Sequence, residues 1–194
     1  MLRTKEQWEK IYTEHRTPWD AESPDPHFVS IIKEGVIQPC AALDLGCGTG
    51  NEAIFLAQRG FEVIGVDISQ NATKEAGLRA SKAGVKCDFI VSDILTAPID
   101  RTFDLVLDRA CFHFLDPKDR GVYLKNLCRW LRSGGTFFLV VSSSHETAKG
   151  PHQFSKTDLQ KTFDHDFYTE NIKLVTLQTH GEKPRPYICL FKKK

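Results

Sequence analysis

Short apolar segments alternate with helical segments through the middle of this chain of 194 residues. The runs CAALDL, FEVIGVD, KCDFIVSD, FDLVLDRA and GGTFFLVVSS are strand-like, and most of the stretches between them have helical periodicity. Strands that alternate with helices form a parallel sheet with helices on both of its faces. This alternation therefore predicts an α/β fold.

The end of the chain departs from that alternation. Two strand-like runs, NIKLVTLQT and RPYICLFKK, are joined only by HGEKPR. A parallel pair needs a crossover of a dozen or more residues, so these two runs should pair antiparallel. We therefore expect a mostly parallel sheet that is closed by a C-terminal antiparallel hairpin, with helices on both faces.

Composition and residue spacing exclude several classes of protein. The 26 basic and 25 acidic residues leave a net charge of +1, which gives no electrostatic reason to expect a nucleic-acid partner. The six cysteines form no CxxC pair, and the histidines lack ligand spacing, so we expect reduced thiols and no metal site. No apolar leader or stretch of transmembrane length is present. We therefore expect a cytoplasmic protein without a membrane partner.

A glycine-rich loop follows the first strand of the alternation. It carries Gly46, Gly48 and Gly50 in the spacing G-x-G-x-G, whereas a dinucleotide fingerprint has its third glycine where Asn51 stands here. Asp44 ends the preceding strand, where its charge would repel a pyrophosphate. The loop therefore favours a cationic ligand over the nicotinamide cofactor of a dehydrogenase.

Acidic residues also end the next strands, in order along the chain. Asp67 is placed to accept hydrogen bonds from two ribose hydroxyls. Asp93 is placed to reach an adenine amino group, with Ile94 nearby, and Asp108 and Arg109 end the following strand. Ligands of open α/β sheets bind at these carboxyl ends. Any one of the acids would also suit a helix cap or a turn, but the ordered set indicates S-adenosylmethionine, which carries hydroxyls, an amine and positive charge.

Motifs along the chain support this ligand. LDLGCGTG, VDIS, SDI, FDLVLDR and LRSGGTFFLVV resemble the ordered motifs of class I S-adenosylmethionine-dependent methyltransferases, over about residues 41–194. The N-terminal stretch WEKIYTEHRTPWD and the later stretch LDRACFHFLDPKDRGVYLKNL are similar to the thiopurine, thiol and halide methyltransferase group. The resemblance implies a Rossmann-like core and an enzyme that uses S-adenosylmethionine.

The resemblance also assigns residues to the cofactor. Asp44 and Gly46 would flank its methionine part, and three aromatic residues of the N-terminal segment would line it and cover the site. Aromatic faces attract a sulfonium as they attract other cations, although spacing alone would also suit aromatics that fasten a surface helix. Tyr12 stands where plant-type members tend to have tryptophan. The complete expected set is Trp8, Tyr12, Trp19, Asp44, Gly46, Gly48, Asp67, Ile68, Asp93, Ile94, Asp108 and Arg109.

His113 is a weak candidate for a catalytic base, since imidazole titrates near neutral pH. It would equally suit a packed histidine between Phe112 and Phe114. A thiol acceptor, with a pKa near about 8.5, needs little help from a base. No other catalytic residue is assigned from the sequence.

These observations define the expected protein. It is one methyltransferase domain over residues 1–194, with a helical lid segment at 1–35 and a core at 41–194, acting as a monomer or weak homodimer. The expected reaction is methyl transfer to a small molecule, with a thiol or other soft nucleophile as the first choice. An oxygen, nitrogen or metalloid (tellurite-like) acceptor is the alternative. A non-catalytic module that binds S-adenosylmethionine is the alternative from another class.

Overall fold

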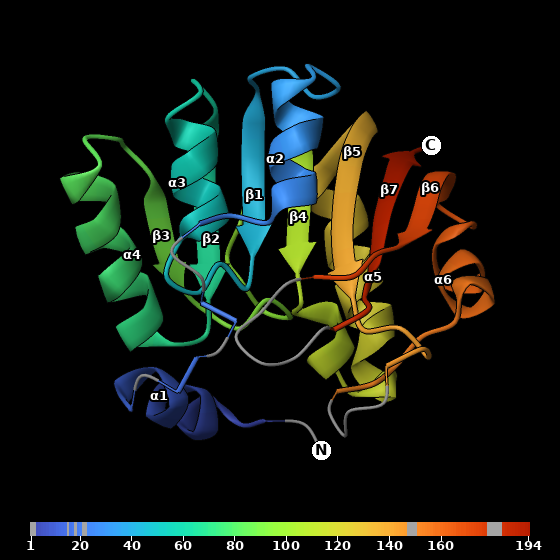
Figure 1. Cartoon of the computed structure of the whole chain (residues 1–194), viewed down its shortest axis with the longest axis horizontal. Helices are drawn as coiled ribbons and strands as arrows, with labels where there is room; N and C mark the ends of the chain where they lie inside the picture. Colours follow the sequence, from blue (N-terminus) through green and yellow to red (C-terminus); the bar gives the residue numbers. More distant parts are fainter. Residues whose placement is uncertain (1–2, 15, 18, 21–22, 147–150, 178–183) are drawn as a thin grey trace. The chain divides into compact units, whose positions relative to one another are not determined.

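The computed structural model describes residues 3–14, 16–17, 19–20, 23–146, 151–177 and 184–194 (Figure 1). The chain divides into two compact units. We call Lys5–Ala97 the N-terminal unit, and Met1–Thr4 together with Pro98–Lys194 the C-terminal unit. Each unit is described by itself, and the single domain over residues 1–194 stays a prediction.

The N-terminal unit alternates helices and strands as the sequence predicts. β1 pairs with β2 and β2 pairs with β3, both parallel, so β2 is the central strand of the three. Helix α3 packs on β2, and α4 packs on β2 and β3. The elements are α1 (Lys5–Thr13), α2 (Pro26–Lys33), β1 (Ala41–Leu45), α3 (Asn51–Ala57), β2 (Glu62–Asp67), α4 (Gln70–Lys82) and β3 (Asp88–Val91).

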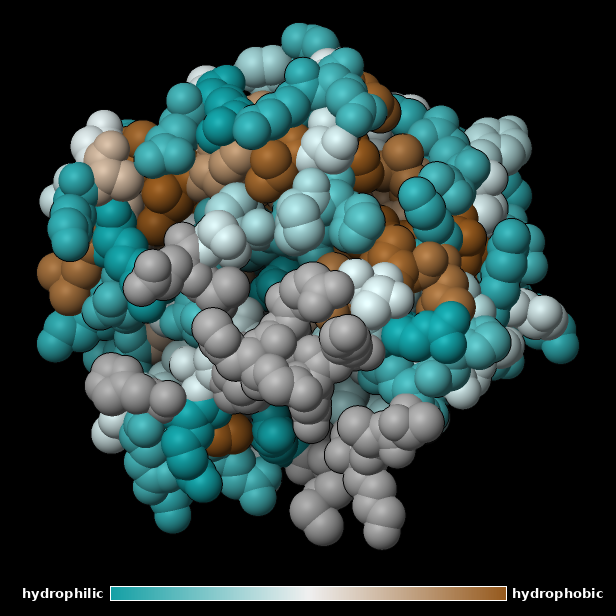
Figure 2. Space-filling model, viewed as in Figure 1, coloured by the Kyte–Doolittle hydropathy of each residue, from teal (hydrophilic) through white to brown (hydrophobic). Residues whose placement is uncertain are grey.

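Local chemistry sets where these helices begin. Asp25 caps α2 by accepting hydrogen bonds from the backbone N–H groups of His27 and Phe28, and Pro26 occupies the first turn, where no N–H is needed. Ser69 caps α4 by accepting from Ala72 N. Helix α1 is different, because none of its residues is fully buried. Figure 2 shows mainly hydrophilic side chains over this helix, at the lower left.

The loop between β1 and α3 explains the three glycines of its motif. Gly46, Gly48 and Gly50 have φ angles of 68°, 53° and 85°. Glycine adopts this left-handed region without the steric cost of a Cβ atom. Gly50 is also the residue that caps α3. The loop therefore turns sharply from strand to helix through backbone conformations that a residue with a Cβ atom rarely adopts.

The C-terminal unit contains the expected hairpin. β4 and β5 are parallel, and β7 lies antiparallel between β5 and β6. The elements are β4 (Phe103–Arg109), η1 (Phe112–Phe114), η2 (Pro117–Asp119), α5 (Arg120–Trp130), β5 (Leu131–Val141), α6 (Lys156–Phe163), β6 (Phe167–Leu174) and β7 (Tyr187–Lys193). The α/β class, the mostly parallel strands and the C-terminal antiparallel hairpin are therefore confirmed.

One boundary differs from the sequence prediction. Strand β6 covers Phe167–Leu174, whereas the apolar pattern placed it at residues 171–179. The shift has a packing reason, since Phe167 joins Phe137, Phe163 and Phe191 in one aromatic cluster with ring centroids 4.8–6.3 Å apart. Residues 180–183, in the expected connection to β7, lie outside the described residues. In the described part of the chain, no helix is long and apolar enough to cross a membrane.

Candidate cofactor site

The Asp67 carboxylate lies at the centre of the candidate site. Asp67 ends β2 and is 6% exposed. Its Oδ2 accepts a hydrogen bond from Gly48 N at 2.9 Å, and its Oδ1 accepts one from Ser69 N at 2.9 Å. The carboxylate therefore fixes the glycine loop to the end of β2. Burial raises the pKa of Asp67 above its usual range, and the two backbone N–H groups oppose that shift.

The residues around Asp67 fit S-adenosylmethionine. Each carboxylate oxygen has two lone pairs, so Asp67 keeps the capacity to accept hydrogen bonds from ribose hydroxyls while it holds the loop. Gly46 and Gly48 are partly exposed and present bare backbone. A Cβ atom on Gly48 would lie 2.9 Å from the Tyr12 hydroxyl, so only glycine lets the loop approach that ring. An acidic acceptor beside bare backbone and aromatic rings suits a nucleoside with a sulfonium.

The three aromatic residues of the N-terminal segment come together at the glycine loop. The Trp19 side chain donates a hydrogen bond to the Tyr12 hydroxyl, and the rings of Trp8 and Trp19 meet edge to face with centroids 5.9 Å apart. Burial and the negative charge of Asp67 raise the pKa of Tyr12, so its phenol stays neutral. The structure thus places Trp8, Tyr12 and Trp19 together, as a cover over the loop requires.

Glu9 fastens α1 to the start of α4, a contact that the sequence analysis missed. Its carboxylate accepts hydrogen bonds from Ser69 Oγ at 2.6 Å and from the backbone N–H groups of Gln70 and Asn71 at 2.8 and 3.2 Å. The first turn of a helix favours a negative charge. The contact joins residues 60 or more positions apart, and no local sequence pattern marks it.

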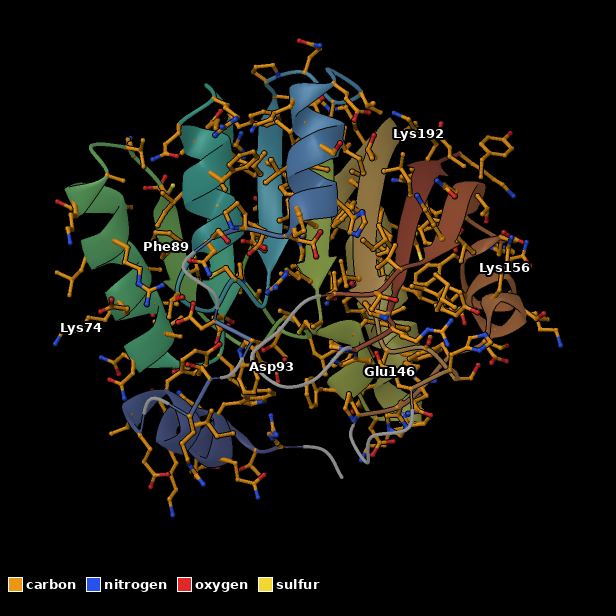
Figure 3. All side chains as sticks on the ribbon, viewed as in Figure 1. Lys74, Phe89, Asp93, Glu146, Lys156 and Lys192 are labelled. Carbon is orange, nitrogen blue, oxygen red and sulfur yellow. The ribbon has the colours of Figure 1, made fainter. Side chains whose placement is uncertain are left out.

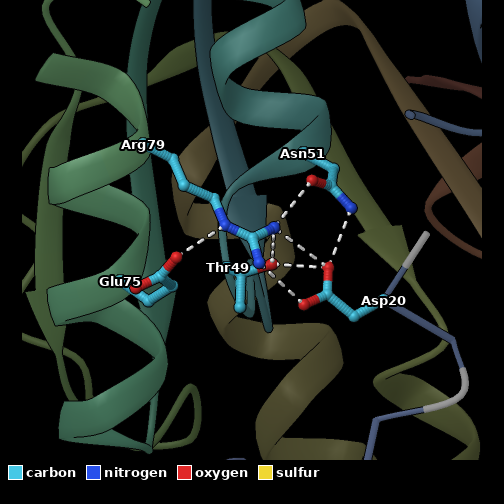
Figure 4. Close-up of polar contacts among 5 residues, drawn as sticks. All are labelled: Asp20, Thr49, Asn51, Glu75 and Arg79. Atoms are coloured by element: carbon cyan, nitrogen blue, oxygen red, sulfur yellow. Dashed lines mark hydrogen bonds and ion pairs between the residues drawn. The ribbon is translucent and has the colours of Figure 1, made fainter. Parts of the chain in front are cut away.

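Asp20 makes a second set of hydrogen bonds that hold the N-terminal segment, and the sequence pattern did not predict them. Its Oδ1 accepts hydrogen bonds from Thr49 Oγ1 at 2.7 Å and Asn51 Nδ2 at 3.0 Å, and its Oδ2 accepts from the Arg79 guanidinium at 3.3 Å (Figure 4). Asn51, which replaces the third glycine of a dinucleotide fingerprint, thus uses its side chain to hold the N-terminal segment. The available signal was the acid at the end of Thr-Pro-Trp-Asp.

The remaining expected residues of this unit occupy strand ends and the loops after them. Asp44 is 2% exposed on β1, and Ile68 is half-buried between Asp67 and Ser69. Asp93 lies in the loop after β3 (Figure 3), where its Oδ1 accepts a hydrogen bond from Leu95 N at 2.9 Å. Ile94 is 6% exposed. Asp93 therefore shapes a turn, and its assignment to adenine stays a prediction.

Asp108, in the C-terminal unit, is fully buried and heavily hydrogen-bonded. It accepts from Cys111 N at 2.8 Å, from Phe112 N at 3.1 Å and from the Tyr123 hydroxyl at 2.7 Å. These bonds hold the turn after β4, in which Ala110 has a φ of 70°, a strained value for a residue with a Cβ. Burial raises the pKa of Asp108 to about 6. The geometry favours a structural role, and its cofactor contact, like that of half-buried Arg109, stays a prediction.

His113 has the geometry of a packed histidine. It is 7% exposed, its ring meets Phe114 edge to face, and its Nδ1 accepts a hydrogen bond from Ser142 N at 3.0 Å. Burial, together with the charges of His152 and Arg3, lowers the pKa of His113 to about 3. With Nδ1 as the acceptor, the proton of the neutral ring lies on Nε2. The ring therefore has no free lone pair with which to take a proton from the molecule that receives the methyl group.

No metal centre adds to this site within the residues that the structure describes, since none of their histidines, cysteines and carboxylates gather in a group of three or more. The expectation of a reaction without a metal ion stays a prediction.

Comparison with known proteins identifies the class. A family model described as a methyltransferase domain matches residues 42–135. The probable thiol methyltransferase 2 of Arabidopsis thaliana is 27% identical over 157 residues, which cover 79% of this chain and 70% of the relative. The 2-heptyl-1-hydroxyquinolin-4(1H)-one methyltransferase of Mycobacteroides abscessus is 26% identical over 86% of this chain and 75% of its own length.

A solved structure agrees in fold. The 1,6-didemethyltoxoflavin-N1-methyltransferase of Burkholderia thailandensis, with bound 1,6-didemethyltoxoflavin and S-adenosylhomocysteine, has a TM-score of 0.83 at 20% identity. The match covers 98% of this chain and 87% of that one. The expected enzyme and fold are therefore confirmed: this chain is an S-adenosylmethionine-dependent methyltransferase with the class I fold, and it resembles the thiol methyltransferases.

Proposed function

We propose that this enzyme methylates a small molecule through a thiol, or another soft nucleophile that ionises by itself near neutral pH. The state of His113 carries the proposal, because this base candidate is locked as a neutral hydrogen-bond acceptor at Nδ1. An alcohol or amine acceptor needs a base, whereas a thiol with a pKa near about 8.5 is already partly thiolate. The likeness to a thiol methyltransferase supports the same acceptor class.

The residues of the N-terminal unit are given the following roles. Asp67 accepts hydrogen bonds from the ribose, and Asp93 and Ile94 hold the adenine. Asp44 and Gly46 flank the methionine part. Bound S-adenosylmethionine supplies a methyl group on a sulfonium, and its transfer to a thiolate removes both charges. Such a step is faster where water is excluded.

In this proposal the aromatic residues of the N-terminal segment exclude water from the cofactor. Trp8, Tyr12 and Trp19 already lie together at the glycine loop. Their faces attract the sulfonium by about 0.5–2 kcal/mol. Six free thiols and a net charge of +1 support a reducing, cytoplasmic setting and an acceptor other than nucleic acid.

The test is turnover of S-adenosylmethionine with thiols of graded pKa, beside phenols, amines and a metalloid oxyanion. We expect thiols to be preferred, with a rate that rises with pH through the pKa of the thiol itself. EDTA should leave the rate unchanged. Preference for a phenol with loss of turnover in EDTA would instead favour a metal-dependent oxygen methyltransferase.

The substitution His113→Asn tests whether His113 acts as a base or as a packing residue. The asparagine oxygen accepts the Ser142 N–H in place of Nδ1, so we expect turnover to stay within about threefold of the wild-type rate. A loss of about a hundredfold at an unchanged melting temperature would make His113 the base and overturn the argument.

A further inference from the structure

Asp20 gathers hydrogen-bond donors from two other parts of the N-terminal unit. Thr49 and Asn51 belong to the glycine loop and the start of α3, and Arg79 belongs to α4 (Figure 4). Arg79 also donates to Thr49 Oγ1 at 2.9 Å and to Asn51 Oδ1 at 3.3 Å. The four side chains thus form one closed network, in which each loop residue contacts both charged groups.

This network is more than a surface ion pair. The Asp20 side chain is 12% exposed, the Arg79 side chain is 37% exposed, and Thr49 is 8% exposed. A shielded carboxylate with several donors is worth more than an exposed pair, and its removal leaves the donors without their acceptor. The network therefore holds the segment that carries Asp20 in one position.

The segment held in this way lies over the expected cofactor position. Trp19 directly precedes Asp20 and donates to Tyr12, whose hydroxyl lies beside Gly48. Gly48 in turn donates its backbone N–H to Asp67. At the other end of the segment, Glu9 is bound to the start of α4. The segment is thus fastened at Glu9 and at Asp20, with Tyr12 and Trp19 between these two residues and Trp8 directly before Glu9.

We infer that Asp20 and Arg79 form a latch, which holds the aromatic segment closed over the glycine loop and sets how fast the cofactor leaves. Glu9 holds the end of the segment that contains helix α1. Release of the other end, at Asp20, would therefore uncover the loop. Asp20 is then a positioning residue, which acts through Trp19 and Thr49. The inference rests on the cofactor position proposed above and on nothing about the acceptor.

The test measures dissociation of S-adenosylhomocysteine from the whole protein by stopped-flow fluorescence of its tryptophans. Asp20→Ala and Arg79→Ala should each raise the dissociation rate by about tenfold, and the double variant should be no faster than either single one. Glu75→Gln is the matched control, because Glu75 Oε1 accepts from the same guanidinium at 2.9 Å but contacts neither Asp20 nor the loop in Figure 4. It should leave the rate within about twofold.

A second readout reports the segment directly. The Arg16 side chain is 63% exposed, so trypsin has access to the bond after it once the segment leaves the body of the unit. With saturating S-adenosylhomocysteine, Asp20→Ala should be cut there faster than the wild type and Glu75→Gln at the wild-type rate. If Asp20→Ala fails to fold, Thr49→Val removes one donor at constant volume and should change both readouts in the same direction.

A wild-type dissociation rate in Asp20→Ala, with only a lower melting temperature of the unliganded protein, would overturn the latch, and so would single-variant effects that multiply in the double variant. The acceptor plays no part in either measurement. A wrong acceptor class would therefore appear in the turnover assay and leave these results untouched.

Discussion

At the scale of single residues, Asp67 has two tasks, since it holds the glycine loop and is proposed to bind the ribose. Asp67→Asn keeps one oxygen acceptor but loses the charge, so cofactor binding should weaken by about 1.5–3 kcal/mol. Calorimetry with S-adenosylhomocysteine measures this loss. Asp88→Asn, on exposed Asp88 of β3, is the control and should bind as the wild type does. Equal affinities for both variants would remove Asp67 from the site.

The raised pKa of Asp108 predicts how the stability of the protein changes with pH. Its pKa is about 6 in the folded protein and about 3.9 in an unfolded chain, so the folded state binds the extra proton between these values. Relative to Asp108→Asn, the wild-type free energy of unfolding should therefore fall by about 3 kcal/mol as the pH rises from about 4 to above 6. Urea unfolding of both proteins across this range measures the difference. A difference that does not vary with pH would contradict the pKa.

Tyr123→Phe extends this test. The Tyr123 hydroxyl donates to Asp108 Oδ2 at 2.7 Å and stabilises the charged form of the carboxylate. Without it, the pKa of Asp108 should rise further, and the pH range over which stability falls should move upward.

At the scale of elements, a substitution in the N-terminal segment can show whether its aromatic residues cover the cofactor or pack the fold. Trp19 is half-buried on this segment, whereas Trp130 ends α5 and is fully buried. Trp19→Ala should lower turnover by about tenfold or more and leave the melting temperature of the unliganded protein nearly unchanged. Trp130→Ala should cost about 3–5 kcal/mol of stability. A large loss of stability in Trp19→Ala with normal turnover would make Trp19 a packing residue.

At the scale of the whole molecule, the cofactor should stabilise the fold. At about a hundred times its dissociation constant, a ligand adds about 2.7 kcal/mol, which raises the melting temperature of a protein of this size by about 5–10 °C. S-adenosylhomocysteine should produce such a shift and NAD should produce none. The reason is that Asp44 and Asn51 occupy positions where a pyrophosphate needs neutral, bare backbone. A shift with NAD alone would contradict the assignment of the glycine loop.

Features that depend on neighbours along the chain could be predicted from the sequence. Apolar periodicity placed the strands and helices, and the positive φ angles of Gly46, Gly48 and Gly50 follow from the turn that the motif predicts. The connection before β7 was too short for a crossover, which fixed the antiparallel hairpin. The place of Asp67 at the end of a parallel strand was also predicted, and its role in binding the cofactor stays a prediction.

Which acids stabilise the fold and which hold the N-terminal segment follows from contacts between distant parts of the chain. Asp108 was predicted as a site residue at a strand end, which stays a prediction, and the structure adds that its carboxylate is bound within the turn and to Tyr123. Glu9 carried no local signal, and Asp20 carried only its place at the end of Thr-Pro-Trp-Asp, because both side chains contact residues 59 to 62 positions away. A carboxylate takes its role from the donors around it. Those donors come from distant parts of the chain, which only folding brings together.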